Sequence, residues 1–97
     1  HIAIYKKVVE NTIPSVELLR DTLQAKSKEF WNVVKIGRTH LMDATPLTVG
    51  QEFSGYAQQI ENGIARLEST QPMLMQLAQG GTAVGTGLNA PIGFAEK

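Results

Sequence analysis

The sequence predicts an all-α fold in which long helices pack side by side as in a helical bundle. Two observations point to it. Apolar residues recur every three or four positions from Ile2 to Phe30, and apolar residues seven positions apart mark a second segment from Thr48 to Gln79. Both spacings place apolar side chains on one stripe of a helix. The 97 residues are therefore expected to form a single partial domain whose helices need apolar neighbours.

The first helix is expected over about residues 2–32. Pro14 lies inside this segment, and a proline removes a backbone donor and clashes with the preceding turn of a helix. No turn-forming cluster flanks Pro14 on both sides, so the pattern favours a kink near Thr12 over a break between two helices.

The second helix is expected over about residues 48–79, and its stripe is close to a heptad repeat. At about 1.5 Å per residue it would be a rod of about 45 Å. A compact chain of this length has a radius of gyration of only about 13 Å, so the rod is expected to pack against partners. Pro72 is expected to bend its last turns. The spacing of seven is carried by Phe53, Ile60, Leu67 and Leu74.

Between the two helices, residues 34–47 are predicted to be a loop, and polar groups are unusually dense in it. A lone histidine in a loop is more often structural than catalytic. Here, however, a cation, hydroxyls, an imidazole and a carboxylate occur within eight residues, which favours proton-transfer chemistry. Gly37 and Pro46 are expected to fix the path of the loop. The polar residues are Arg38, Thr39, His40, Asp43 and Thr45.

A second loop, rich in glycine, is predicted over residues 80–93, and residues 94–97 are expected to begin a further helix. The loop matches neither nucleotide-binding fingerprint, because position 86 is threonine and position 90 is alanine. Two interpretations stay open. Thr82, Thr86 and Asn89, with backbone N–H groups, could surround a small anion such as a carboxylate; alternatively, Gly80 or Gly81 caps the preceding helix and a tight turn follows.

The composition excludes several classes of function. Nine basic and nine acidic residues give a net charge of zero, which argues against a nucleic-acid partner. No cysteine is present and the two histidines are 39 positions apart, so no metal site is predicted. No apolar run approaches the roughly 20 residues of a membrane span, so no membrane association is expected. A reducing compartment, the cytoplasm or a mitochondrial matrix, suits such a chain.

Two long motifs resemble a known family. The stretches "KIGRTHLMDATPLTVGQEFSGY" (35–56) and "LAQGGTAVGTGLN" (77–89) are similar to the central part of class II fumarate hydratase, the metal-independent fumarase of the fumarase/aspartase superfamily. The likeness extends over essentially the whole chain, from "HIA" to "IGFAEK". Motifs of this length are hard to reach by chance.

The resemblance implies a fold, an activity and roles for individual residues. Members of this family are mostly helical homotetramers, and their active sites combine three sequence regions from three subunits. By this likeness Thr39 binds a carboxylate of the substrate, and His40, helped by a glutamate outside this chain, activates the water that adds to fumarate to give (S)-malate. Thr86 and Asn89 are expected to bind substrate as well. No cofactor is implied.

Three alternatives are weaker. Aspartase shares both motifs but typically has glutamine where His40 stands. Argininosuccinate and adenylosuccinate lyases share the threonine–histidine pair but not "GGTAVGTGLN" in this form. A non-catalytic helical module that only self-associates is the alternative from another class.

Two departures from the family pattern bear on activity. Met42 stands where the family usually has glutamine, which removes an amide from beside the site. The family's "GSSxMPxKxN" loop and "SSNDxxP" segment are absent, and both ends of the chain are interpreted as cuts. The chain is therefore expected to be a fragment that is inactive alone.

Overall fold

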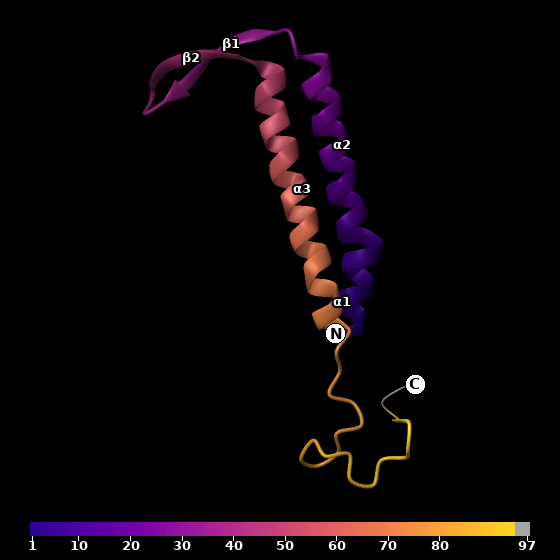
Figure 1. Cartoon of the computed structure of the whole chain (residues 1–97). Helices are drawn as coiled ribbons and strands as arrows, with labels where there is room; N and C mark the ends of the chain where they lie inside the picture. The colour runs from indigo at the N-terminus through magenta and orange to yellow at the C-terminus, as the bar shows by residue number, and fades with distance from the viewer. Residues whose placement is uncertain (95–97) are drawn as a thin grey trace.

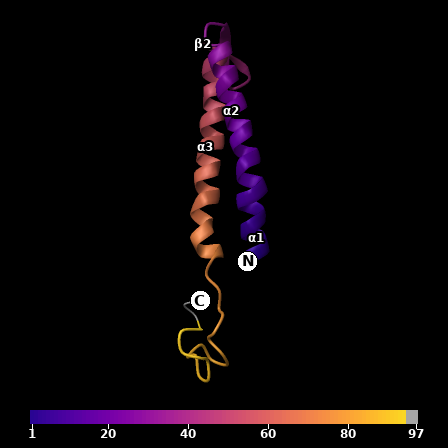
Figure 2. The same cartoon turned by 90° about the vertical axis from the view of Figure 1, so that its right-hand side faces the viewer.

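The structure, a computed structural model, describes residues 1–94. It is elongated, with extents of 69 × 27 × 15 Å and a radius of gyration of 22.5 Å, where a compact chain of this length would have about 13 Å. Two helical arms run side by side, a β-hairpin projects from one end of the pair, and the glycine-rich segment leaves the other end (Figures 1 and 2). The chain is thus mostly helical but includes a small two-stranded sheet, so the all-α expectation is only roughly met.

The N-terminal arm is helical throughout, in three parts: α1 (Ile2–Lys7), a π-helical turn η1 (Val8–Thr12) and α2 (Ile13–Glu29). The expectation of an irregularity near Thr12 without a break is confirmed. Pro14 is in the first turn of α2, where its missing N–H leaves one hydrogen bond unmade, and the wider π turn before it accommodates the ring. The arm ends at Glu29, slightly before the expected residue 32.

The second arm is α3 (Val49–Leu74), and its sequence explains its start. The backbone N–H of Gln51 donates to Thr48 Oγ1 (3.1 Å), and the backbone N–H of Thr48 donates to Gln51 Oε1 (2.8 Å). This reciprocal pair is a capping box, which satisfies two N–H groups that a helix start leaves without partners. The predicted beginning of this helix is therefore confirmed.

The end of α3 corrects the expected boundary at residue 79. The helix stops at Leu74. Beyond it, the N–H of Met75 donates to Gln71 O (3.1 Å) and the N–H of Gln76 donates to Met73 O (3.3 Å). Pro72 lies inside the final turn, where it cannot donate to the carbonyl four residues earlier. The helix thus ends two residues after the proline, where the sequence predicted only a bend. Gly80 lies beyond this end, with φ of 86°, so the interpretation of Gly80 or Gly81 as the helix cap is wrong.

The predicted loop at residues 34–47 is an antiparallel β-hairpin instead. Strands β1 (Val34–Thr39) and β2 (Met42–Thr48) pair from Val34 with Thr48 at the base to Thr39 with Met42 at the tip. The residue types of both strands, rich in valine, isoleucine, leucine and threonine, suit strands. The sequence reading missed them because no Asn-Gly or similar dipeptide marks the turn.

The contact between α2 and α3 is narrow. Gly50, Ala57 and Ile64 are buried on α3, again seven residues apart, and Ile13 and Ser27 are buried on α2. The stripe named from the sequence, which begins at Phe53, lies beside this row and is half-buried. The heptad spacing is therefore correct, but the residues of closest contact belong to the neighbouring row.

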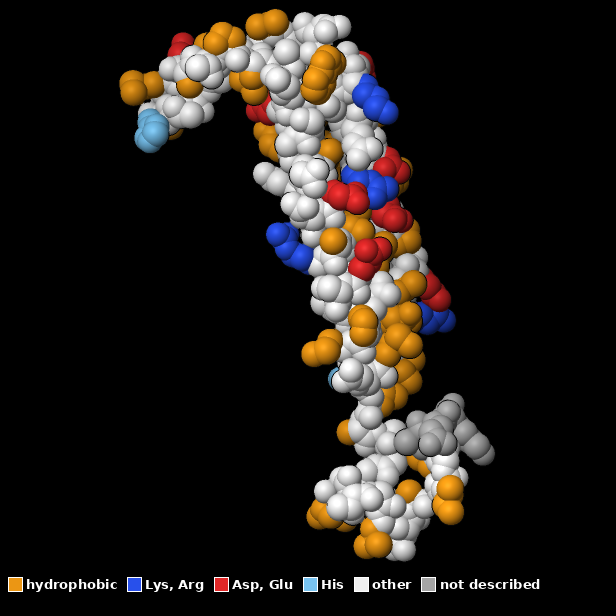
Figure 3. Space-filling model, in the orientation of Figure 1, with side chains coloured by type: hydrophobic (Ala, Val, Ile, Leu, Met, Phe, Trp, Pro, Cys, Tyr) orange, Lys and Arg blue, Asp and Glu red, His pale blue; other side chains and the backbone are white. Residues whose placement is uncertain are grey.

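Large apolar side chains remain exposed on both arms. Figure 3 shows hydrophobic groups gathered over the α1 end of the pair and at the end of the hairpin. Apolar surface on this scale is usually covered by further protein. The strongly exposed apolar residues of the helices include Ile2, Ile4, Leu18, Leu19 and Met73.

After α3, residues 76–93 contain no helix or strand. Of the helix expected at 94–97, only Phe94 is among the described residues, and 95–97 lie outside them. Within residues 1–94, no helix combines the length and the apolar character that crossing a bilayer requires.

Candidate functional site

The hairpin turn consists of two residues, His40 and Leu41, with φ of 53° and 62°. Two successive positive φ values are the form of a type I′ turn, which matches the right-handed twist of the flanking strands. Asparagine and glycine are the usual residues there, because a side chain such as leucine costs about 1 kcal/mol or more in this conformation. A strained tip is held only when the surrounding structure supports it, and such positions gather at functional sites.

Gly37 lets the two strands approach each other. The regular register is interrupted between Ile36 and Arg38, as in a β-bulge. A Cβ added at position 37 would lie 2.6 Å from the carbonyl oxygen of Thr45 on the facing strand, closer than any real Cβ contact. The expected role of Gly37 in fixing the path of this segment thus has a steric basis.

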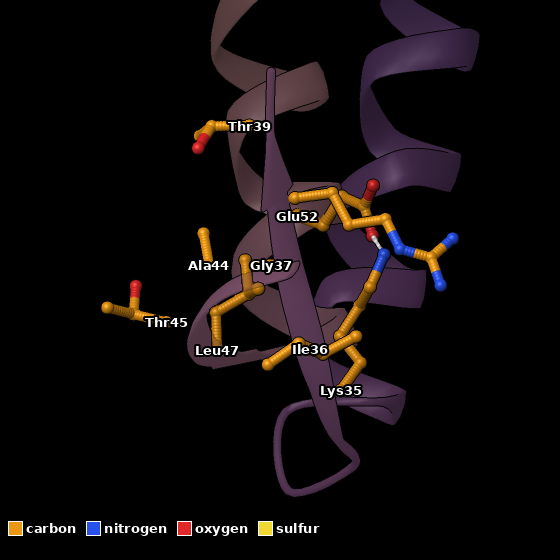
Figure 4. A pocket seen from close by; sticks show the side chains of 9 residues that line it. Lys35, Ile36, Gly37, Thr39, Ala44, Thr45, Leu47 and Glu52 are labelled. Carbon is orange, nitrogen blue, oxygen red and sulfur yellow. Dashed lines mark hydrogen bonds and ion pairs between the residues drawn. The ribbon is translucent and has the colours of Figure 1, made fainter. Parts of the chain in front are cut away.

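Thr39 and His40 both lie at the tip and both are exposed. Thr39 is the last residue of β1, beside Met42 across the strand pair. An open cleft of about 640 Å³ runs along the hairpin (Figure 4), and Thr39 lines it together with Lys35, Gly37, Arg38, Thr45 and Glu52. His40 is beyond the far end of this cleft, at the turn. The pair is therefore presented outward by the hairpin and is not enclosed by this chain.

A group of three polar side chains joins the hairpin to α3, and we name it the Glu52 brace. One carboxylate oxygen of Glu52 accepts from Lys35 Nζ of β1, and the other accepts from the hydroxyl of Tyr56 (3.0 Å), one helical turn further along α3. Figure 4 shows Lys35 reaching the carboxylate of Glu52. The side chains of Lys35 and Glu52 are 38% and 34% exposed, so solvent only partly screens the pair.

The brace shifts two pKa values. The hydrogen bond from Lys35, then that from Tyr56, lowers the pKa of Glu52, and the hydrogen bond to Glu52 raises the pKa of Tyr56. Because the pKa of Glu52 is lower in the folded chain than in the unfolded chain, its ionised carboxylate stabilises the fold at pH values above the unfolded pKa. This stabilisation is lost as the pH falls through the lowered, folded pKa. The pKa of Tyr56 is higher in the folded chain, so its protonated hydroxyl stabilises the fold at pH values below the unfolded pKa. This stabilisation is lost as the pH rises through the raised, folded pKa. The brace therefore stabilises the fold throughout the neutral pH range.

The sequence reading missed all three members of the brace. Spacing alone could have found two of the three, because Glu52 and Tyr56 are four residues apart and share one face of α3. Lys35 could not be found, since it reaches Glu52 only because residues 34–39 form a strand. A second ion pair, Arg38 Nε to Asp43 Oδ1 (3.2 Å), crosses the hairpin near the tip. Both its side chains are largely exposed, so it contributes little to stability.

The two groups of predicted site residues lie at opposite ends of the elongated structure. Thr86 and Asn89 belong to the glycine-rich segment, away from the hairpin (Figures 1 and 2). Thr82 and Asn89 have positive φ values of 56° and 66° and line a separate cleft of about 380 Å³, whereas Thr86 is exposed outside that cleft. One copy of this chain cannot bring Thr86 or Asn89 to His40.

Metal ligands are not grouped in the described part of the chain. No cluster of three or more histidine, cysteine, aspartate or glutamate side chains occurs within residues 1–94.

Comparison with known proteins assigns the chain to a family. A family model described as "Lyase" matches residues 1–97. The chain belongs to the lyase family. It is 69% identical over 97 residues to the class II fumarate hydratase of Haemophilus influenzae, covering 100% of this chain and 21% of that relative. It is 58% identical over 94 residues to the mitochondrial fumarate hydratase of Dictyostelium discoideum, covering 97% of this chain and 19% of that relative.

A solved relative has the same fold as this lyase chain. The crystal structure of recombinant class II fumarase from Schistosoma mansoni superimposes with a TM-score of 0.92 at 46% identity, covering 98% of this chain and 20% of that one. The resemblance drawn from the two motifs is thereby confirmed. The chain spans about a fifth of the length of the relatives it matches.

Proposed function

We propose that this lyase chain is a central part of a fumarate hydratase, which reversibly adds water to fumarate to give (S)-malate. The observation that carries the proposal is the outward presentation of Thr39 and His40 at the strained hairpin tip. The 69% identity to a class II fumarate hydratase supports the choice of substrate. The histidine favours hydration over the ammonia-lyase chemistry of aspartase, where glutamine is typical at this position.

The chemistry of hydration suits these two residues. Adding water across the double bond of a dicarboxylate needs a base that takes a proton from water, and hydrogen-bond donors for the negative charge that spreads onto a carboxylate. The imidazole of His40 serves proton transfer and the hydroxyl of Thr39 donates to a substrate carboxylate. No metal and no other cofactor takes part in this scheme.

The rest of the pocket comes from other copies of the protein and from sequence outside residues 1–97. Thr86 and Asn89, proposed to bind the substrate as well, lie at the end of the chain away from the hairpin. They can join Thr39 and His40 only if a second copy supplies them. The exposed apolar faces of α1, α2 and α3 support a homotetramer built through these helices. We place the enzyme in the cytoplasm, or in the mitochondrial matrix of a eukaryote.

A turnover assay with two samples tests this proposal. The full-length enzyme that contains this chain is expected to consume fumarate, measured as loss of fumarate absorbance, and to form malate. The 97-residue chain at the same molar concentration is expected to give no turnover above buffer, because it presents only one side of the pocket. Turnover by the short chain, or none by the full-length enzyme with fumarate and malate, would contradict the proposal.

A further inference from the structure

Within residues 1–94, few contacts outside its own strands orient the hairpin. At its base, the N–H of Val49 donates to the carbonyl of Val33 (2.8 Å), and the N–H of Gly50 donates to the carbonyl of Phe30 (3.0 Å). These bonds fix where the chain enters and leaves the hairpin. Two strands without further support are only marginally stable. Within the described residues, the angle at which the hairpin leaves the helices therefore depends on side-chain contacts with α3.

Among the described residues, the Glu52 brace joins the side of the hairpin to α3. Glu52 is in the first turn of α3, a helix start that the capping box holds in place. Both of its carboxylate oxygens are engaged, one by Lys35 and the other by Tyr56. A carboxylate bound at both oxygens has little freedom to rotate. Lys35 is consequently tied to a rigid point of the helix pair.

A small change of angle at Lys35 becomes large at the tip. Thr39 is four residues further along β1, about 13 Å away at roughly 3.3 Å per residue of strand. A rotation of about 5° at Lys35 would move Thr39 and His40 by about 1 Å over that lever. A displacement of about 1 Å of a reacting group can lower a rate by about 100-fold.

We propose that Glu52 is a positioning residue: by binding Lys35 and Tyr56 it sets the angle of the hairpin and so the place of Thr39 and His40 in the active site. The expected effect of Glu52 on the reaction rate rests on the proposed function. Its expected effect on the orientation of the hairpin rests on the geometry alone. Glu52 is not proposed to touch the substrate.

Kinetics of the full-length enzyme test the role of the brace. Glu52→Gln keeps the size of the side chain and removes its charge, and Lys35→Met removes the other partner. Each variant is expected to lower kcat/KM for fumarate by about tenfold or more, with kcat reduced. The oligomeric state should stay unchanged and the melting temperature should fall only slightly, because the lost ion pair is partly exposed. The double variant Lys35→Glu with Glu52→Lys restores opposite charges and is expected to recover part of the lost activity.

Glu29→Gln is the matched control. It removes an exposed ion pair with Lys26 on α2 (2.7 Å), which plays no part in the brace, and is expected to leave kcat/KM unchanged. If Glu52→Gln had the same kcat/KM as the unmodified enzyme, or lowered activity only in proportion to lost folded protein, the positioning role would be wrong. A charge-reversed double variant no more active than either single variant would also overturn it.

Hydrogen exchange separates failure of this inference from failure of the proposed function. In Glu52→Gln, peptides covering residues 34–48 are expected to exchange several-fold faster than in the unmodified enzyme, with peptides of α2 unchanged. This result does not depend on which substrate the enzyme uses. An enzyme without hydratase activity that shows the faster exchange would overturn the proposed function and keep the brace. Unchanged exchange at 34–48 would overturn the brace, whatever the kinetics.

Discussion

Replacing His40 with asparagine in the full-length enzyme is expected to lower kcat for fumarate hydration by about 100-fold to 10,000-fold, the usual contribution of a positioned acid or base. Asparagine is chosen for its backbone preference. It tolerates the positive φ of 53° at this position, so the turn keeps its form. The variant therefore removes the imidazole without releasing the hairpin.

Three readouts distinguish a chemical role for His40 from a structural one. Because the side chain is exposed, the melting temperature should change little, as for most surface substitutions. KM should change only a few-fold, since Thr39 still binds the carboxylate. A fall in kcat with nearly constant KM indicates an interaction made in the transition state. A variant with full kcat would remove His40 from the mechanism.

Replacing Gly50 with alanine is expected to destabilise the helix pair by about 3 kcal/mol, the upper part of the usual range for overpacking. A Cβ at this position would lie 2.5 Å from the carbonyl oxygen of Ser27 and 2.5 Å from Cα of Trp31. Both are backbone atoms, so no side chain can turn away to make room. The arms would have to separate, which would break the bonds that Gly50 makes with Ser27 Oγ (2.8 Å) and with the carbonyl of Phe30 (3.0 Å).

Gly55→Ala is the control, because it makes the same chemical change in the same helix. Nothing lies within 4 Å of a Cβ built on Gly55, and alanine in a helix interior is favoured over glycine by roughly 0.5–1 kcal/mol. In urea titrations followed by circular dichroism, the midpoint should fall for Gly50→Ala and stay level or rise for Gly55→Ala. Equal midpoints for the two variants would contradict the close packing at Gly50.

The helices could be predicted from the sequence because their signals are local. The start of α3 follows from Thr48 and Gln51, three residues apart, and the irregularity before α2 follows from Pro14. The expected end of α3 was too late because the apolar pattern continues to Leu77, whereas the helix ends at Leu74, two residues after Pro72. Periodicity reports which residues share a face, and it does not report whether the helix persists.

The hairpin was missed for a physical reason. Its turn places histidine and leucine at positive φ. These residue types do not favour that conformation, so tertiary contacts must stabilise it. Thr39 and His40 could nevertheless be proposed as site residues, since their chemistry is visible in the sequence. The contacts that orient them are not, because the bond between Lys35 and Glu52 spans 17 residues and exists only once the strands have formed.

The position of a bound dicarboxylate in a crystal structure of the full-length enzyme tests the account most directly. With malate bound, the hydroxyl of Thr39 should lie about 3 Å from a carboxylate oxygen, a hydrogen-bonding distance, with the ring of His40 facing the carbon that carries the hydroxyl group. Malate bound away from the hairpin, or the ring of His40 packed into an apolar interior that no ligand reaches, would contradict it.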